Sequence, residues 1–203
     1  MRGAAMRRVC DELERRGFEL SRARALEFFA REGDWQATAY ADRVASLEAW
    51  EVDPSHEARL KANLPHATVR IVDSIAFARR AENRRRFDFV VLDNPQGCFG
   101  PDGRYCEHFE ALEAALEVVS DRAVLVFDVN RAPFDLERFP AWRARRAEYY
   151  GVADASRLAS GALLGFYRAL LERRGFAAAS GFEIPRNPEY LSYLSYLVER
   201  GPA

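Results

Sequence analysis

The sequence is poor in cysteine and in long apolar stretches, and both scarcities exclude classes of protein. Three cysteines, Cys10, Cys98 and Cys106, are too few for a disulfide framework, and one of them would always stay unpaired. No run of about 18 apolar residues suggests a membrane span. The first 17 residues form a charged, amphipathic pattern, unlike the apolar core of a secretion signal. We therefore expect reduced thiols, a cytoplasmic protein and no membrane segment.

An excess of positive charge is also absent. The 30 basic and 31 acidic residues give a net charge of −1, and Lys61 is the only lysine. Such a balance lacks the broad positive field that marks many nucleic-acid-binding proteins. Arginine runs at 84–86 and 143–146 could contact phosphates, but solvated helix faces often carry such runs, and acidic neighbours such as Glu148 dilute the second one. Nucleic acid is therefore not the expected partner.

What the sequence does contain is an alternation of short apolar runs and helical patterns. We expect strands at about 24–30, 46–53, 67–73, 87–93 and 121–129, and helices at about 1–20, 35–45, 54–64, 74–85, 107–119 and 156–175. Alternation of this kind predicts βαβ units and a parallel sheet with helices on both faces. A length of 203 residues suits one domain, residues 1–203, of doubly wound α/β class.

The rhythm changes after the fifth strand. Residues 131–155 form a long connection rich in arginine and aromatic residues, and one interpretation is a lid inserted over a pocket. The stretch from 176 to 200 then reads as two strands around the turn Arg186-Asn187-Pro188. These two strands would complete a mostly parallel, seven-stranded sheet with a C-terminal antiparallel hairpin.

Polar residues gather where the predicted strands end, which is where ligands bind in open α/β sheets. The ends carry Glu27, Glu51, Asp73 and Asp93. Carboxylates at the second and third ends could accept hydrogen bonds from a ribose and an adenine amino group. The alternative is that Asp73, like Asp53 beyond the second strand, only caps the helix that follows.

Three segments resemble motifs of the class I S-adenosylmethionine-dependent methyltransferases. LEFFAREG (26–33) is similar to their nucleotide loop LDLFAGSG, and WEVDPSHEARLKANLP (50–65) is similar to their second strand and helix. FDFVVLDNPQG (87–97) is similar to the fourth strand that ends in DPPY or NPPY in amino-methylating members. The resemblance covers about residues 24–130, and the expected topology continues it to the end of the chain.

The resemblance implies a cofactor, S-adenosylmethionine, and a set of site residues. Around the cofactor it places Glu27, Phe28, Gly33, Glu51, Val52, Asp73 and Ser74. Glu27 and Gly33 would shape the loop around the methionine part, and Glu51 would hold the ribose hydroxyls. Asp73 with Ser74 would meet the adenine. Asp93 and the backbone carbonyl of Asn94 would face the acceptor, so the protein would mainly position a nucleophile and help remove its proton.

The sequence departs from the family pattern at two places. Phe29 and Arg31 stand where the loop usually has glycine, and Gln96 replaces the aromatic residue that stacks on a nucleobase. We therefore expect a small-molecule acceptor, methylated on oxygen or nitrogen, rather than RNA. Two alternatives stay open: an aminopropyltransferase-like enzyme, because DNPQGCFGPDGRYCEHFEAL is similar to the polyamine-synthase pattern, and a non-catalytic binding or scaffold protein.

The segment after the fourth predicted strand offers further acid–base groups. Tyr105, Glu107 or His108 could lie at the mouth of the pocket and take a proton from the acceptor. The alternative is that these residues begin a helix and line its solvent face. Cys98, Cys106 and His108 match none of the usual spacings of zinc ligands, so no metal is expected.

Overall fold

A computed structural model of the chain describes residues 3–134 and 136–201. The predicted domain 1–203 includes residues 1, 2, 135, 202 and 203, and the predicted segment 131–155 includes residue 135; these five positions lie outside the described residues. The main sheet is formed by β1 (Arg24–Phe28), β2 (Ser46–Glu51), β3 (Thr68–Ile71), β4 (Phe87–Leu92), β7 (Val119–Asn130), β8 (Phe176–Asn187) and β9 (Leu191–Arg200). Two further strands, β5 (Cys98–Phe99) and β6 (Tyr105–Cys106), form a separate small hairpin.

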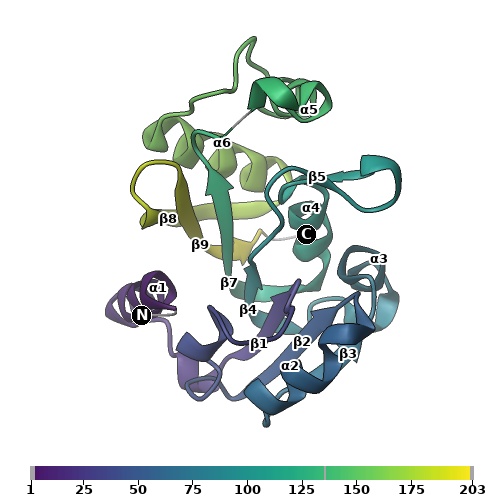
Figure 1. The fold of residues 1–203 in the computed structure, drawn as a ribbon. Coiled ribbons are helices and arrows are strands. Elements are labelled where there is room, and N and C mark those ends of the chain that lie inside the picture. The colour runs from purple at the N-terminus through teal and green to yellow at the C-terminus, as the bar shows by residue number, and fades with distance from the viewer. Residues whose placement is uncertain (1–2, 135, 202–203) are drawn as a thin grey trace.

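The sheet has the order β3-β2-β1-β4-β7-β9-β8 (Figure 1). The first five of these strands pair in parallel, and β9 runs antiparallel to both β7 and β8. The fold class predicted from the sequence is thus confirmed, including the C-terminal hairpin. Each of the first four strands stops one or two residues before its predicted end, so that Asp73 and Asp93 follow strands rather than belong to them.

The helices cover both faces of the sheet. They are α1 (Ala4–Arg15), α2 (Glu57–Asn63), α3 (Ser74–Ala78), α4 (Phe109–Val118), α5 (Pro140–Tyr150) and α6 (Ser160–Arg173), with short 3₁₀ turns η1 (Leu20–Arg22), η2 (Ala37–Ala39), η3 (Pro54–His56), η4 (Ala81–Asn83), η5 (Pro101–Gly103) and η6 (Leu136–Arg138). In Figure 1, α1 and α4 lie on opposite sides of the central strands. Among the helices of residues 3–134 and 136–201, none is both long enough and apolar enough to cross a membrane.

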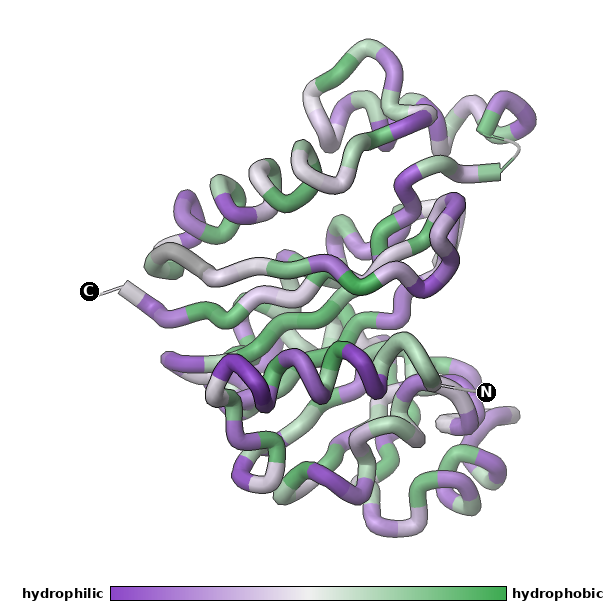
Figure 2. Tube along the Cα trace, turned by 90° about the vertical axis from the view of Figure 1, so that its left-hand side faces the viewer, coloured by the Kyte–Doolittle hydropathy of each residue, from purple (hydrophilic) through white to green (hydrophobic). Residues whose placement is uncertain are grey.

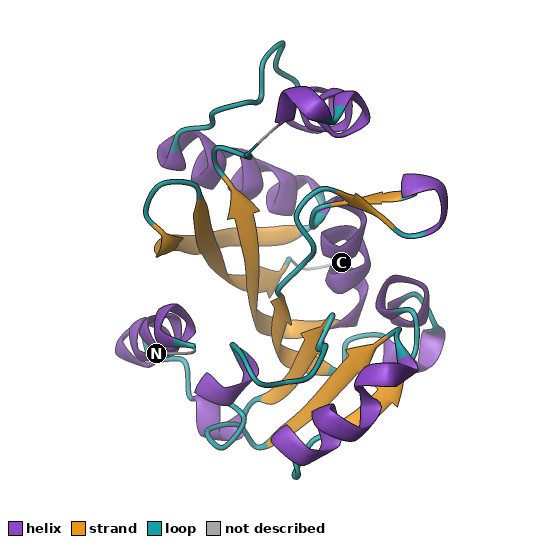
Figure 3. Ribbon diagram, in the orientation of Figure 1, coloured by secondary structure: helices purple, strands orange, loops and turns teal. Residues whose placement is uncertain are grey.

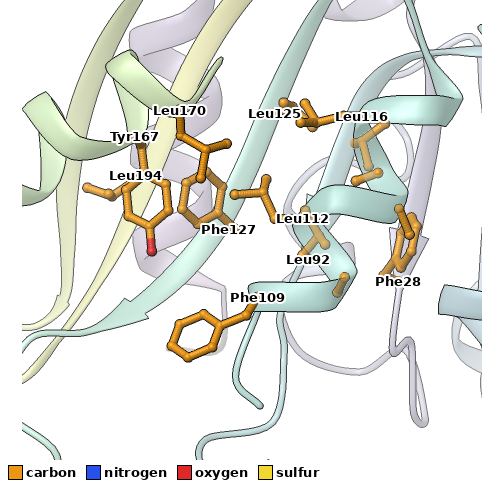
Figure 4. Close-up of a cluster of buried hydrophobic side chains, with 14 of the residues drawn as sticks. Phe28, Leu92, Phe109, Leu112, Leu116, Leu125, Phe127, Tyr167, Leu170 and Leu194 are labelled. Carbon is orange, nitrogen blue, oxygen red and sulfur yellow. The ribbon is translucent and has the colours of Figure 1, made fainter. Parts of the chain in front are cut away.

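Two hydrophobic layers result, because successive side chains of a strand point to opposite faces. Along β7, Leu125 and Phe127 pack against α4 and α6, whereas Val124 and Val126 pack toward α1. Figure 4 shows Phe127 next to Tyr167 of α6, in the larger of the two layers. Figure 2 shows largely hydrophobic residues along the middle strands and alternating residue character along the helices, as expected for elements that bury one side.

Two of the predicted helices are wrong in extent. Residues 35–45 form only the short turn η2, because Gln36, Ala37, Ala39 and Tyr40 are all buried, and one face of a helix could not bury so many nearly consecutive side chains. The predicted helix 74–85 is split into α3 and η4. There the side-chain amide of Asn83, which is buried, donates a hydrogen bond to the carbonyl of Phe77 at 2.8 Å and satisfies the end of α3.

The segment 131–155 contains an ordered helix, α5, that is fastened to the body of the protein. Arg146 is fully buried, and its guanidinium forms an ion pair with Glu107, just before α4. The same guanidinium donates to the carbonyls of Asn130 at 2.8 Å and Ala155 at 3.1 Å. Trp142 donates its indole N–H to Glu107 at 2.7 Å. These bonds tie both ends of the connection and the start of α4 to one side chain.

Removing this arginine should destabilise the protein strongly. Arg146→Ala leaves Glu107 buried without its cation, a change that typically costs about 3–5 kcal/mol. Arg143→Ala is the matched control on the same helix, because Arg143 pairs with Glu137 at the surface and such pairs contribute less than about 1 kcal/mol. Denaturant unfolding of both variants measures the difference, and equal losses for the two would contradict the anchoring role of Arg146.

Candidate functional site

Two cavities meet at the carboxyl ends of the parallel strands. The smaller has a volume of about 370 Å³ and is formed mainly by the loop after β1, residues 29–37. The larger, of about 560 Å³, lies between the ends of β2, β3 and β4 and the hairpin β5–β6. Both are lined by Phe29, Arg31, Asp93 and Arg186. The cavities are therefore adjoining parts of one site, at the place where sheet proteins of this architecture bind ligands.

The loop after β1 keeps unusual backbone conformations without the expected glycines. Phe29 has φ +58° and Arg31 has φ +48°, in the left-handed region that costs an L-residue about 1–2 kcal/mol. Gly33, with φ +67°, is required for another reason. A Cβ atom there would lie 2.7 Å from a methyl group of Leu60 and 2.8 Å from one of Leu64. Gly33 thus allows α2 to pack closely under the loop.

Glu51 joins this loop to the end of β2. Its carboxylate accepts hydrogen bonds from the backbone N–H groups of Val52 and Asp53, both at 2.9 Å, and of Arg31, at 2.7 Å. Three donors leave about one acceptor position, since a carboxylate offers roughly four. Glu51 is buried but lines the larger cavity, so that remaining position can serve a ligand hydroxyl.

The residues that follow β2 and β3 supply an apolar and an acidic side chain to the larger cavity. Val52 lines the larger cavity and is 62% exposed, an unusual state for an apolar side chain. Asp73 and Ser74 line the same cavity. Asp73 also caps α3, because its Oδ1 accepts the N–H groups of Ile75 and Ala76 at 3.0 Å each. The capping role considered for Asp73 is therefore present. The second carboxylate oxygen of Asp73, Oδ2, lies 3.5 Å from the hydroxyl of Tyr105.

Asp53, the acid beyond the second strand, has a different position. It accepts the N–H of Ser55 at 2.8 Å and caps η3, and it is absent from the lining of both cavities. The capping role considered for Asp53 is therefore present, whereas Glu51 of the same strand end lines the larger cavity.

Three carboxyl groups and one guanidinium form the floor where the cavities meet. Arg186 forms an ion pair with Asp93 and lies 3.3 Å from an oxygen of Asp128. Burial raises the pKa of both aspartates, although Arg186 lowers it in part. Burial and the nearby Asp93 likewise raise the pKa of Glu27, which is fully buried. We call this set, Glu27, Asp93, Asp128 and Arg186, the acidic floor.

Amide side chains hold the acidic floor in place. Gln36 donates to one oxygen of Glu27 at 3.0 Å, whereas the other oxygen, Oε2, has no hydrogen-bond partner in the part of the chain that the structure describes. Gln96 donates to Asp128 at 2.9 Å, and the backbone N–H of Asn94 donates to the same carboxylate at 3.1 Å. A fully buried carboxylate oxygen without a donor is costly, and a ligand that supplies one would relieve the cost.

Sequence reasoning missed Asp128, Arg186 and Gln96 as parts of one cluster. Asp128 lies in β7, where a single charge interrupts the apolar run VLVFDV. That isolated charge is a signal that could have identified it, since a charged group in a central strand requires a partner. Arg186 comes from the end of β8, and no local pattern indicates that this hairpin places it over β4. Gln96 was assessed only as a lost stacking platform.

The structure brings together most of the predicted site residues. Glu27, Gly33, Glu51, Val52, Asp73, Ser74, Asp93, Asn94 and Tyr105 all line one of the two cavities. Phe28 lies elsewhere. Its side chain is fully buried in the core, 5.4 Å from the ring centre of Trp50. Asn94 lines the larger cavity, but its carbonyl already accepts a hydrogen bond from Gln96 at 3.3 Å.

Glu107 and His108 directly precede α4, as the helix-start alternative predicts, but neither interpretation describes their surroundings. Both are buried, so they lie neither at the pocket mouth nor on a solvent face. His108 bonds through Nε2 to the hydroxyl of Tyr167, inside an aromatic cluster with Phe109 and Phe127. Burial, with a smaller effect of Arg146, lowers the pKa of His108 to about 3, so its ring is neutral at neutral pH. Across residues 3–134 and 136–201, no three His, Cys, Asp or Glu residues are grouped as metal ligands.

Comparison with known proteins relates this geometry to one fold. No protein-family model and no curated protein matches the sequence. Among solved structures, 1,6-didemethyltoxoflavin-N1-methyltransferase from Burkholderia thailandensis is 16% identical, with a TM-score of 0.59 over 98% of this chain and 80% of that chain. The N-methyltransferase NodS from Bradyrhizobium japonicum is 13% identical, with a TM-score of 0.56 over 97% of both chains. A proposed RNA methyltransferase from Pyrococcus horikoshii is 17% identical, with a TM-score of 0.56 over 98% and 84%. The chain therefore has the fold of class I methyltransferases.

The buried carboxyl of Glu27 should make stability depend on pH. A carboxyl group with a raised pKa keeps its proton to higher pH in the folded than in the unfolded state, so stability falls as pH rises above the unfolded value of about 4.3. Glu27→Gln removes this group and should stabilise the free protein at pH 7.5 by on the order of 1 kcal/mol, but not near pH 4. Glu57→Gln, on the exposed side of α2, is the control. Unfolding curves at both pH values test this, and a pH-independent effect of Glu27→Gln would count against a raised pKa.

Proposed function

We propose that the chain is an S-adenosylmethionine-dependent methyltransferase that acts on the nitrogen or oxygen of a small molecule. The observation that carries the proposal is the acidic floor, where Arg186 pairs with two carboxyl groups, Asp93 and Asp128, and a third, Glu27, is fully buried near Asp93. Such a site favours a cationic ligand, because buried carboxylates need counter-charges. S-adenosylmethionine carries both an ammonium and a sulfonium group, and the fold supports a cofactor at this edge of the sheet.

The residues present fit the parts of this cofactor. Glu27 lines the smaller cavity, and its Oε2, buried and without a donor among the described residues, would accept a hydrogen bond from the ammonium group. The free acceptor position of Glu51 suits a ribose hydroxyl. Val52, exposed beside Asp73, offers an apolar surface to an adenine ring, and the second oxygen of Asp73 could accept from its amino group. The cofactor would supply an electrophilic methyl group on sulfur.

Asp93 is the group best placed to meet the acceptor. It lies at the junction of the two cavities, and it can accept a hydrogen bond or a proton from an N–H or O–H nucleophile. In the free protein, the guanidinium of Arg186 balances part of the charge of the Asp93 carboxylate. Asp128 stands behind it and holds Gln96 and the backbone of Asn94 at fixed positions. The chain thus orients a nucleophile, and little further chemistry is required of its side chains.

A small molecule is favoured over a nucleobase as the acceptor. Gln96 is bound to Asp128 and offers no aromatic platform, whose stacking typically contributes about 1–3 kcal/mol per base. The toxoflavin-precursor and the proposed RNA methyltransferases have different acceptors, so the fold supports the reaction type rather than one acceptor. The polarity of the acidic floor favours an amine or a hydroxyl compound.

Cofactor binding is the first test. Calorimetric titration should show that the protein binds S-adenosylmethionine and S-adenosylhomocysteine, and that Glu51→Ala weakens both by about 1.5–3 kcal/mol, or roughly tenfold to a hundredfold. Asp53→Ala is the matched control, because Asp53 adjoins the same strand end but lines neither cavity. Absence of binding by the folded wild-type protein would favour a scaffold role. Preference for decarboxylated S-adenosylmethionine would favour aminopropyl transfer.

Methyl transfer is the second test. With labelled S-adenosylmethionine at a saturating concentration and a panel of small amines and hydroxyl compounds, Asp93→Asn should lower turnover about a hundredfold, because the variant lacks the group that accepts the proton of the nucleophile. Asp88→Asn is the control at the other end of the same strand, where Asp88 pairs with Arg24, and it should keep the parent's turnover. Equal turnover of Asp93→Asn and wild type would remove Asp93 from the catalytic machinery.

A further inference from the structure

The hairpin β5–β6 brings two cysteines together beside the larger cavity. It forms a two-stranded sheet of its own, apart from the main sheet (Figure 3). Phe99, Gly100, Pro101 and Tyr105, which lie between its cysteines in the sequence, line the cavity. Cys98 and Cys106 are opposite each other in the register of the two strands. Neither the fold nor the proposed methyl transfer requires thiols at these positions.

The hydrogen-bond pattern shows which kind of pair the cysteines form. The N–H of Glu107 donates to the carbonyl of Gly97 at 2.8 Å, so these two residues form a hydrogen-bonded pair of the ladder. Hydrogen-bonded and non-hydrogen-bonded pairs alternate in antiparallel strands, and the next pair, Cys98 and Cys106, is therefore non-hydrogen-bonded. Side chains are closest in such pairs, with Cα atoms typically about 4.5 Å apart. Disulfides span Cα separations of about 4.4–6.8 Å, so the backbone can accept one here.

The two thiols differ in exposure. Cys98 is exposed, whereas Cys106 is fully buried. Burial and the neighbouring Glu107 raise the pKa of the Cys106 thiol, and the Cys98 thiol opposite it raises this pKa further. An external oxidant would therefore reach Cys98 first, because it is the accessible thiol. Cys106, opposite Cys98, can then react with the oxidised sulfur of Cys98.

We propose that Cys98 and Cys106 are a redox-active pair that closes to a disulfide across the hairpin. The Cys98 thiolate attacks one sulfur of a low-molecular-weight disulfide such as oxidised glutathione, and one glutathione thiolate leaves. Cys106 loses its proton to solvent, and its sulfur attacks that of Cys98 and releases the second glutathione as a thiolate. Two protein thiols are oxidised, and one glutathione disulfide is reduced to two thiols. This chemistry is independent of the proposed methyl transfer.

Closure of the disulfide would fix the wall of the larger cavity. Only two residue pairs join β5 to β6, and Gly100 and Gly103, the least restricted kind of residue, lie in the turn between them. A covalent link between its strands would hold residues 99–105 in this conformation and restrict local opening. Reduction would restore the opening. The redox state of the pair would thereby control how freely the cavity wall moves.

Mass spectrometry and thiol counting during incubation with oxidised glutathione test the proposal. The wild-type protein should lose the mass of two hydrogen atoms, and its titratable thiols should fall from three to one. Dithiothreitol should reverse both changes. In Cys106→Ser the glutathione adduct on Cys98 should persist, because no second thiol resolves it. In Cys98→Ser the buried Cys106 should stay reduced, and Cys10→Ser should behave as wild type.

A second measurement follows the hairpin itself. Hydrogen exchange of residues 99–105 should be slower in the oxidised than in the reduced wild-type protein, whereas residues of α2 should exchange equally in both states. A stable glutathione adduct on wild-type Cys98, or unmodified thiols at both positions, would overturn the proposal. Because these readouts need no cofactor, they remain decisive if S-adenosylmethionine fails to bind.

Discussion

A single guanidinium holds together the carboxyl end of the sheet. Arg186 comes from the end of β8, at the edge of the sheet, and pairs with Asp93 after β4 and Asp128 in β7. Two buried carboxylates without it would repel each other, and at least one would be protonated. The C-terminal hairpin therefore does more than extend the sheet. By placing β9 between β7 and β8, it carries the counter-charge of the site across two strands.

A second buried arginine has a comparable function near the same end of β7. Arg146 of α5 binds Glu107 and the carbonyls at the start and end of the connection between β7 and α6. This connection was interpreted from its length as a possible lid. The buried ion pair means that any opening of α5 would have to separate two charges in a medium that stabilises neither. The hairpin β5–β6, held by only two residue pairs, is the part of the cavity wall with fewer restraints.

The sequence was sufficient for the fold because the strands are short, apolar and regularly spaced, and because right-handed crossovers leave few topologies. It also identified the acids that follow strands, since strand ends converge at one edge. It was insufficient where a property depends on contacts distant in the chain. The imidazole of His108 could accept a proton, but it lies buried among Phe109, Phe127 and Tyr167. Arg31 replaces a glycine yet keeps its backbone conformation, because Glu51 binds its N–H group from the next strand.

The charges of the acidic floor connect stability to ligand choice. In the free protein, three carboxyl groups face one guanidinium, and burial raises the pKa of each carboxyl. While no ligand is bound, burial favours the protonated form of these carboxyls. A cationic ligand competes with those protons, so its binding displaces them, and a neutral analogue of the same shape gains nothing from that exchange. The site that we propose for S-adenosylmethionine would therefore distinguish the sulfonium of the substrate from the neutral sulfide of the product by charge, since the two differ little in shape. Product release would then be favoured by the same buried acids that bind the cofactor.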